Sequence, residues 1–350
     1  MKVTMKDIAE RTGYSISTVS RVLSNSSRIS NKAKEEIFQA ARKLNYKFSP
    51  ITSSERSAWL QNIALITDFH EGEFYSSFFY GFLQATREKN IRLSLLNVYN
   101  PHEEMETFIK DIVSEGYFDG IILFVPELTQ SEYISILKQI PRDFPIVSNA
   151  LIDNPKITTI TFDGYSGGTQ AAQHLDKIGL QKVGIIKGPR SKAESRFRSN
   201  GFRDYITNTD HMQIIWEYEG NFEYPSGIKA FENLMATKLH PEGIFVSNDL
   251  MATAFIGQAK SKGLKIPEDM AIISYDDLPL CVQNVPTITS INTDFTRLGL
   301  YTIQQLEVKL KGGTDGFSAL SLIPVELIPR ESTLKNKLAN NLSVTTSAHS

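Results

Sequence analysis

The chain has 350 residues, of which 41% are hydrophobic and 22% charged, a composition typical of a soluble globular protein with two or three domains. No window approaches the roughly 18 consecutive apolar residues that a membrane span needs, and the N-terminus shows no secretory signal, so we expect neither a membrane nor a secreted protein. The single cysteine, Cys281, excludes an intrachain disulfide and favours the reducing cytoplasm.

The net charge of −2 hides an asymmetry between the two ends of the chain. Residues 1–50 hold ten Lys and Arg against four Asp and Glu, a net charge of +6, whereas the rest holds 27 against 35, a net charge of −8. A basic module therefore precedes an acidic body, and only the module is expected to bind a polyanion. Charge alone supports nucleic acid and a solvated surface about equally.

The N-terminal module shows the pattern of three short helices. Thr4 and Asp7 have the spacing of a capping box, which predicts a helix start. Gly13 can end this helix in the left-handed conformation, and Ser15 can cap a second helix that runs to about Leu23. A third segment would close the core with apolar residues at helical spacing: Ile37, Phe38, Ala41 and Leu44. Together these segments predict a helix-turn-helix with a supporting helix.

The second helix has one face for packing and one face of small polar side chains. At about 100° per residue, Val19, Val22 and Leu23 share one side. The other side carries mostly hydroxyl residues and one arginine: Ile16, Ser17, Ser20, Arg21 and Ser24. Short side chains allow close approach in the DNA major groove, where hydroxyls can bind phosphates and arginine can reach guanine. Because this face coincides with the basic excess, DNA binding is favoured over a purely structural three-helix unit.

The segments "MKDIAERTGYSISTVSRVL", "RIS" and "ARKLNY" resemble the headpiece of the lac-repressor (LacI/GalR) family, and the similarity extends from about Val3 to Thr333. The resemblance implies base contacts by Ile16, Ser17 and Arg21, at the start of the recognition helix and after "TVS". It implies phosphate contacts by four hydroxyl residues: Ser15, Thr18, Ser20 and Ser30. It further implies a repressor that binds a near-palindromic double-stranded operator as a homodimer, since two-fold symmetry matches two half-sites.

Residues 47–60, "KFSPITSSERSAWL", contain Pro50 and show no sustained period, so we predict a hinge. The resemblance implies a leucine here that wedges into the DNA minor groove, but ungapped spacing places Glu55 at that position. Either Trp59 or Leu60 substitutes after a shift in register, or this protein bends its operator less. A plain flexible linker is the alternative.

The rest of the chain alternates β-rich runs with amphipathic stretches. The runs are "NIALI", "RLSLLNV", "GIILFV", "PIVSNA", "ITTITF", "VGIIKG", "GIFVSN" and "AIISYDD", with helical patterns such as "YSSFFYGFLQATREK" and "GGTQAAQHLDKIG" between them. This alternation is typical of βαβ units and predicts an α/β fold with parallel sheets covered by helices. The length favours two lobes over one sheet, with a ligand cleft beyond the carboxyl ends of the strands.

The predicted organisation joins a three-helix helix-turn-helix headpiece to a two-lobed body, which the resemblance implies is like a periplasmic binding protein. The predicted boundaries are headpiece 1–46, hinge 47–60, body 61–333 and flexible tail 334–350. Within the body, we expect the first lobe at about 61–160 plus 292–319 and the second at about 161–291 plus 320–333. The tail has too few apolar positions for a tetramerising coiled coil.

Residues 164–168, "GYSGG", match the G-x-S-x-G motif of a hydrolase nucleophile elbow, between an apparent strand and a helix. A hydrolase of this fold needs an acid and then a histidine, but the only histidine after the candidate acids is His349 in the polar tail. Ser166 is therefore predicted to lie near a helix cap. The sequence also lacks the common nucleotide-binding and metalloprotease motifs, so we predict no catalysis, no metal and no cofactor.

The resemblance implies seven effector contacts in the cleft: Phe74, Tyr75, Arg198, Phe222, Asn248, Asp276 and Phe295. Aromatic faces suit a sugar ring, and Arg, Asn and Asp can bind its hydroxyls, which predicts a small carbohydrate-like effector that switches operator affinity. Individually, these residues could instead be core aromatics, helix caps or a surface ion pair. Where many family members have an aspartate, this chain has Ala150 beside Asn149. Arg196 beside Arg198 then suggests an acidic effector.

Two other classes of protein share some of these features. A sugar receptor of the periplasmic type shares the two-lobed body but is disfavoured by the missing signal and the basic headpiece. An enzyme is disfavoured by the missing acid–base constellation. The sequence therefore predicts a cytoplasmic, sequence-specific transcriptional repressor that is not an enzyme.

Overall fold

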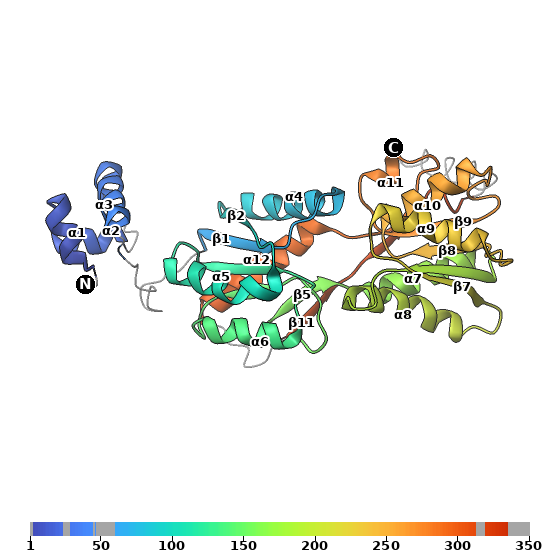
Figure 1. Ribbon diagram of the computed structural model, residues 1–350, viewed down its shortest axis with the longest axis horizontal. Helices are drawn as coiled ribbons and strands as arrows, with labels where there is room; N and C mark the ends of the chain where they lie inside the picture. Colours follow the sequence, from blue (N-terminus) through green and yellow to red (C-terminus); the bar gives the residue numbers. More distant parts are fainter. Residues whose placement is uncertain (1–2, 24–28, 45, 47–59, 313–318, 335–350) are drawn as a thin grey trace, which may run out of the picture.

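The computed structural model describes residues 3–23, 29–44, 46, 60–312 and 319–334. A small helical headpiece is followed along the chain by two α/β lobes (Figure 1). In these described residues, no helix is both long and apolar enough to cross a membrane.

The headpiece consists of three helices, as predicted: α1 (Met5–Thr12), α2 (Ile16–Leu23) and α3 (Asn31–Lys43). Apolar side chains at helical spacing fill its core: Ile8, Ala9, Val19, Val22, Ile37, Ala40 and Ala41. Phe38 and Leu44, which the sequence also placed in this core, pack at its margin and are only partly buried.

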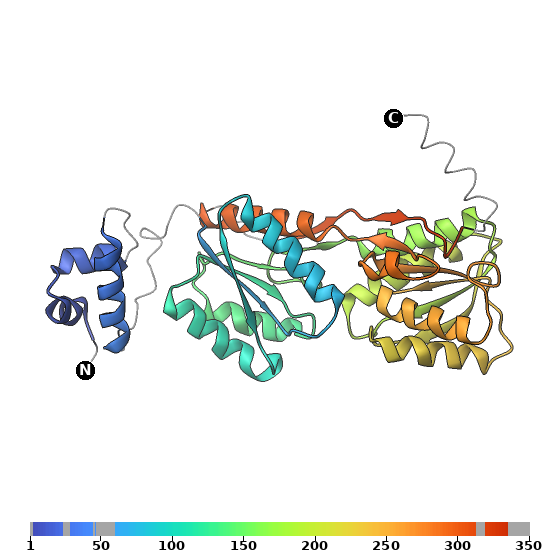
Figure 2. The same ribbon diagram turned by 90° about the horizontal axis from the view of Figure 1, so that it is seen from above.

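The first lobe is built on a six-stranded sheet in the order β11-β5-β4-β3-β1-β2, and every neighbouring pair is parallel. The strands are β1 (Asn62–Thr67), β2 (Arg92–Asn97), β3 (Gly120–Phe124), β4 (Ile146–Ser148), β5 (Thr159–Phe162) and β11 (Leu320–Ile323). Alternate residues of β1 point to opposite faces, where two cores form. One core packs against α5 (Pro101–Glu115) and α6 (Gln130–Gln139), and the other against α4 (Glu73–Arg87) and α12 (Phe295–Leu310), as Figure 2 shows.

The second lobe repeats this design with the strand order β12-β10-β9-β8-β6-β7. Its strands are β6 (Lys182–Lys187), β7 (Gln213–Glu219), β8 (Gly243–Val246), β9 (Ala271–Asp276), β10 (Thr289–Asn292) and β12 (Glu326–Ile328). Only β12 is antiparallel to its neighbour. The helices are α7 (Gly164–Lys177), α8 (Ala193–Thr207), α9 (Tyr224–Met235), α10 (Asp249–Ser261) and α11 (Leu280–Gln283). The predicted α/β fold with parallel sheets is confirmed.

The chain crosses between the lobes after β5, after β10 and after β11. The first two crossings follow Phe162 and Asn292, within a few residues of the lobe boundaries that we expected at about 160 and 292. The third expectation, a crossing at about residue 319, was wrong by several residues, because β11 hydrogen-bonds in parallel to β5 and so belongs to the first sheet. This strand is short and mostly exposed, so it carries no alternating pattern by which the sequence could assign it.

Candidate DNA-binding face and interlobe cavity

The turn between α1 and α2 forms through the local signals that the sequence contains. The Thr4 N–H donates to Asp7 Oδ2 at 2.6 Å at the start of α1. Gly13 has φ 75°, in the left-handed region, and its N–H donates to the Ala9 carbonyl oxygen. Ser15 Oγ accepts a hydrogen bond from the Thr18 N–H at 3.1 Å and caps α2. These three predictions are confirmed, and together they fix how α2 leaves the turn.

The two faces of α2 differ as predicted. Val19 and Val22 are fully buried, whereas Ile16 is 51% exposed and Ser17 and Arg21 are exposed. Ser20 is half-buried at the border, and Ser24 lies outside the described residues. An exposed isoleucine on the first turn of a helix gives no stability to the headpiece itself, but an apolar side chain there can contact a thymine methyl group.

Three of the four hydroxyl residues predicted to contact phosphates, Ser15, Thr18 and Ser30, lie at helix N-termini, where backbone N–H groups favour anions. Ser15 Oγ is 2.8 Å from both Ser17 Oγ and Thr18 Oγ1, which forms a connected hydroxyl cluster. Ser30 directly precedes α3, and its Oγ accepts from the Ala33 N–H at 3.4 Å. The fourth, Ser20, is half-buried at the border between the two faces of α2.

Of the hinge residues considered for the minor-groove wedge, only Leu60 lies within the described residues. Glu55 and Trp59 lie outside the described residues. Leu60 is 6% exposed and belongs to the core of the first lobe that contains Ile63 and Phe82. The proposal that Leu60 acts as a minor-groove wedge was therefore wrong, because its side chain is already packed inside the body.

A cavity of about 590 Å³ lies between the lobes, and all seven residues predicted for the effector line it. Phe74 and Tyr75 come from the first turn of α4, Phe295 begins α12, and Arg198 lies on α8. The others follow strands of the second lobe: Phe222 after β7, Asn248 after β8 and Asp276 at the end of β9. The cavity therefore lies at the carboxyl ends of the strands, as expected for this kind of sheet.

Arg198 is the centre of the polar side of the cavity. Its guanidinium donates to the Ser247 carbonyl oxygen at 2.6 Å and to Asp276 Oδ1 at 3.1 Å, and it lies 3.7 Å from the ring centroid of Tyr275. Burial raises the pKa of Asp276 to about 7, against the lowering influence of Arg198. These contacts hold the guanidinium in one orientation, so Arg198 is not a surface ion pair.

Two cavity residues have a strained backbone. Phe222 has φ 72° and Asp276 has φ 109°, both in the region that non-glycine residues rarely adopt. Asn248 supports the first of them, because its Nδ2 donates to the Phe222 carbonyl oxygen at 2.7 Å. The same asparagine accepts from the Met251 N–H at 3.1 Å and caps α10, so it is a helix cap as well as a cavity residue.

The first lobe contributes an aromatic wall. Phe74 packs edge-on against Phe295 with ring centroids 5.5 Å apart, and against Tyr75 with centroids 5.4 Å apart. Phe78 lies 4.6 Å from Phe124, centroid to centroid, behind this layer. Burial raises the pKa of the Tyr75 hydroxyl, so the ring stays neutral at physiological pH. Flat apolar surfaces of this kind suit the C–H face of a ring-shaped ligand.

Asp276 is the one cavity carboxylate that the sequence indicated; of those that it did not indicate, Glu194 is the most informative. Glu194 lies in the first turn of α8, where an acidic residue is common for helix stability alone, so its sequence context gave no signal. Arg196, which suggested an acidic effector, does not line the cavity and instead binds both carboxylate oxygens of Asp153 at 2.6 Å. Ala150 is fully buried and is likewise absent from the lining.

The G-x-S-x-G motif has a packing role. Ser166 lies in the first turn of α7, where its N–H donates to the capping carboxylate of Asp163 at 2.9 Å. A Cβ on Gly167 would lie 2.6 Å from the Tyr275 ring, and one on Gly168 would overlap the Arg198 carbonyl oxygen. The glycines thus let α7 approach α8 and β9 closely, and the predicted cap position of Ser166 is confirmed.

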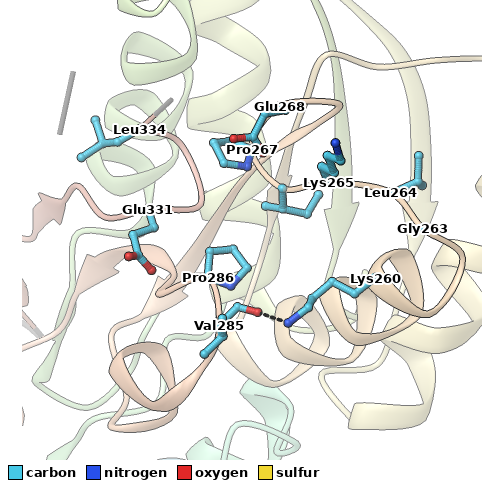
Figure 3. A pocket seen from close by; sticks show the side chains of 11 residues that line it. Lys260, Gly263, Leu264, Lys265, Pro267, Glu268, Val285, Pro286, Glu331 and Leu334 are labelled. Atoms are coloured by element: carbon cyan, nitrogen blue, oxygen red, sulfur yellow. Dashed lines mark hydrogen bonds between the residues drawn. The ribbon is translucent and has the colours of Figure 1, made fainter. Parts of the chain in front are cut away.

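A second pocket, of about 540 Å³, is lined by residues of the second lobe between Lys260 and Glu268 and by Val285, Pro286, Glu331 and Leu334 (Figure 3). Pro267 and Pro286 form part of its wall, and Lys260 Nζ donates to the Val285 carbonyl oxygen at 2.5 Å across its edge. None of the residues predicted for DNA or effector binding lines this pocket.

A helix-turn-helix headpiece joined to a two-lobed body with an interlobe cavity defines a class of bacterial DNA-binding regulators. Residues 4–49 match the family model of bacterial regulatory proteins of the lacI family, and residues 172–333 match that of a periplasmic binding protein-like domain.

The full-length similarities agree with these two matches. The HTH-type transcriptional repressor PurR of Haemophilus influenzae (strain PittEE) is 28% identical over 335 residues, which cover 94% of this chain and 98% of that protein. The ribose operon repressor of Escherichia coli (strain K12) is 27% identical over 332 residues, covering 92% and 97%. A lac repressor dimer bound to operator and the anti-inducer ONPF superposes with a TM-score of 0.73 at 25% identity, covering 96% of this chain and all of the other.

The chain therefore has the DNA-binding domain of the lacI family of bacterial regulatory proteins, followed by a periplasmic binding protein-like body. With these domains and these full-length similarities, it is a DNA-binding transcriptional repressor of the LacI type and not an enzyme.

Proposed function

We propose that this repressor is cytoplasmic and changes its operator affinity when a small carbohydrate-like effector binds between the two lobes. The convergence of the seven predicted residues on one cavity carries this proposal. The cavity volume of about 590 Å³ lies within the range of small-molecule sites. Its aromatic wall suits the apolar C–H face of a sugar ring, and its polar side around Arg198 suits the hydroxyl groups of the sugar. The similarity to a ribose operon repressor also supports a carbohydrate-like ligand.

The effector would act by changing the fit between the lobes. Several hydrogen bonds and ion pairs join them in the present arrangement, including Lys192 to Glu127 at 2.8 Å and the Leu280 N–H to Glu73 at 2.9 Å. A ligand that contacts both lobes favours one relative position and so alters the spacing of two headpieces on DNA. By linkage, the effector and the operator change each other's affinity by the same factor, commonly about 1–3 kcal/mol of coupling.

The protein is proposed to bind its operator as a homodimer. Exposed apolar side chains lie on α4 and the adjacent edge strand β2 of the first lobe: Tyr80, Leu83 and Leu95. Further exposed apolar residues, Val282 and Val285, lie at α11 of the second lobe. Figure 1 shows α4, β2 and α11 along the same long side of the body. Exposed apolar side chains on elements along one side of the body suit contact with a second copy of the chain.

On DNA, we assign base contacts to Ile16, Ser17 and Arg21, and phosphate contacts to four hydroxyl residues: Ser15, Thr18, Ser20 and Ser30. Arg21→Ala tests the assignment, with Arg11→Ala, also an exposed headpiece arginine but on α1, as the matched control. Duplexes are selected from a random-sequence pool by the wild-type protein at one stated salt concentration, and affinities for the selected palindrome and a scrambled duplex are then measured.

Arg21→Ala is expected to lose about 1–3 kcal/mol of discrimination between the two duplexes, whereas Arg11→Ala weakens both about equally. Retained discrimination in Arg21→Ala would contradict the base contact. A sugar panel added to the wild-type complex then tests the switch. If no sugar changes operator affinity, the carbohydrate-like effector is wrong.

A further inference from the structure

The interlobe cavity is richer in carboxylates than in cations. Five carboxylates line it against two cations: Glu71, Glu73, Glu194, Glu223 and Asp276, with Lys192 and Arg198. Both cations already have partners, because Lys192 Nζ is 2.8 Å from Glu127 Oε1 and Arg198 is 3.1 Å from Asp276 Oδ1. Among the described residues, no cation forms an ion pair with Glu73 or Glu194. The cavity thus contains carboxylates that have no ion-pair partner among the described residues.

Glu194 is the carboxylate best placed to bind a ligand. It extends from α8 of the second lobe, and its Oε1 accepts from the Leu151 N–H of the first lobe at 2.7 Å. Burial raises the pKa of Glu194 above its ordinary value, although Arg198 and Lys192 lower it in part. A charged carboxylate in this environment is costly unless a cation approaches it, and a ligand ammonium group would offset that cost.

Asn149 adds an acceptor beside Glu194, since it precedes Leu151 by two residues and lines the same cavity. Its side-chain Nδ2 donates to the Ile160 carbonyl oxygen at 2.9 Å and to Thr302 Oγ1 at 2.8 Å, which fixes the orientation of the amide. Its Oδ1 is buried and has no hydrogen-bond partner among the described residues. A buried acceptor without a donor is unfavourable, so this oxygen also favours a ligand with N–H or O–H groups.

The aromatic wall favours the same kind of ligand. Seven rings line the cavity: Phe74, Tyr75, Phe78, Phe124, Phe162, Phe222 and Phe295. The faces of aromatic rings attract cations, most strongly where water is excluded. Carboxylates without an ion-pair partner among the described residues, an unpaired acceptor and aromatic faces therefore occur together in one cavity.

We propose that the effector is a positively charged amino sugar whose ammonium group binds Glu194 while Asn149 Oδ1 accepts a further hydrogen bond. This inference rests on the proposed function, because it specifies the ligand of the same cavity. It replaces the acidic effector that Arg196 suggested, since that arginine binds Asp153 instead.

Titration calorimetry of the full-length protein at about pH 7 tests the ligand class. The probes are glucosamine, galactosamine and mannosamine, compared with the parent hexoses, N-acetylglucosamine and glucuronate. At least one amino sugar is expected to bind about tenfold or more tightly than its neutral counterparts, and glucuronate least tightly. A neutral hexose that binds as tightly as every amino sugar would overturn the inference and leave the proposed function intact. If no sugar of any charge binds, both are wrong.

Glu194→Gln tests the residue, because glutamine keeps the shape and the acceptor for the Leu151 N–H. Glu219→Gln is the matched control, since Glu219 is exposed, accepts a backbone N–H of the same lobe and lies outside the cavity. Glu194→Gln is expected to weaken amino-sugar binding about tenfold or more and neutral-sugar binding little, without lowering the thermal midpoint. Unchanged amino-sugar affinity in a folded Glu194→Gln variant would refute the role of Glu194.

Discussion

The close approach of α7 and α8 is tested by adding a single methyl group. A Cβ on Gly168 would overlap the carbonyl oxygen of Arg198 and lie 2.9 Å from the backbone nitrogen of Phe202. Both obstacles are backbone atoms, so no side-chain rotation can relieve the overlap. The two helices would have to move apart by roughly 1 Å to restore ordinary contact distances.

Two opposing effects determine the expected stability of Gly168→Ala. Overpacking typically costs about 1–3 kcal/mol, with backbone obstacles at the upper end, whereas alanine in a helix is favoured over glycine by up to about 1 kcal/mol. We therefore expect the free energy of unfolding to fall by about 2 kcal/mol, and Tm by roughly 4–8 °C for a domain of this size. Displacement of Arg198 would weaken effector binding in the same variant.

Gly257→Ala is the control for helix propensity. Gly257 is exposed within α10, and a Cβ there would meet only the Tyr224 hydroxyl at 3.8 Å, an ordinary contact distance. This variant is expected to gain about 0.5–1 kcal/mol. Thermal unfolding followed by calorimetry and circular dichroism compares both variants with the wild type. If Gly168→Ala is as stable as the wild type while Gly257→Ala is stabilised, the packing argument is refuted.

Two further predictions concern pH and assembly. Burial raises the pKa of Asp276 to about 7 in the folded protein. Between about pH 4 and 7, Asp276 is therefore protonated in the folded protein but ionised in the unfolded chain. The free energy of unfolding should fall as the pH rises through this window. Denaturant titrations across this pH range should show that the free energy of unfolding of Asp276→Asn falls less steeply with pH than that of the wild type. Part of the pH dependence remains because burial also raises the pKa of Asp249. An unchanged pH dependence in Asp276→Asn contradicts the raised pKa of Asp276. Leu95→Lys on β2 should raise the dimer dissociation constant about tenfold or more in sedimentation experiments. Leu322 is similarly exposed, on the opposite edge strand β11, and Leu322→Lys should leave the dissociation constant unchanged. Equal effects of the two substitutions would place the interface elsewhere.

The headpiece was predictable because its signals are local. Each signal involves a hydrogen bond between residues three or four positions apart. These bonds form as the spacing predicted at the Thr4 and Asp7 pair, at Gly13 and at the Ser15 cap. The apolar period also assigned Val19 and Val22 to the core.

The cavity was predictable only in part, because it depends on contacts between distant segments. The family resemblance led to seven residues that line it, yet Glu194 escaped attention, since its partner Leu151 is 43 residues away and in the other lobe. Arg196 was misjudged for the same reason, because only the fold shows that Asp153 faces it. Leu60 could not be assigned from sequence, because it lies at the boundary between the hinge and the first strand.

The three crossings between the lobes determine the order in which the protein can fold during synthesis. Phe295 and Leu298 of α12 fill the same core as Phe78 and Phe82 of α4, although more than 200 residues separate the two helices. The first lobe, which the ribosome makes early, therefore stays incomplete until α12 and β11 have emerged. The intervening segment takes on the order of ten seconds to synthesise. The second lobe, almost continuous in sequence, can form its core first, so the lobe nearer the DNA-binding end folds last.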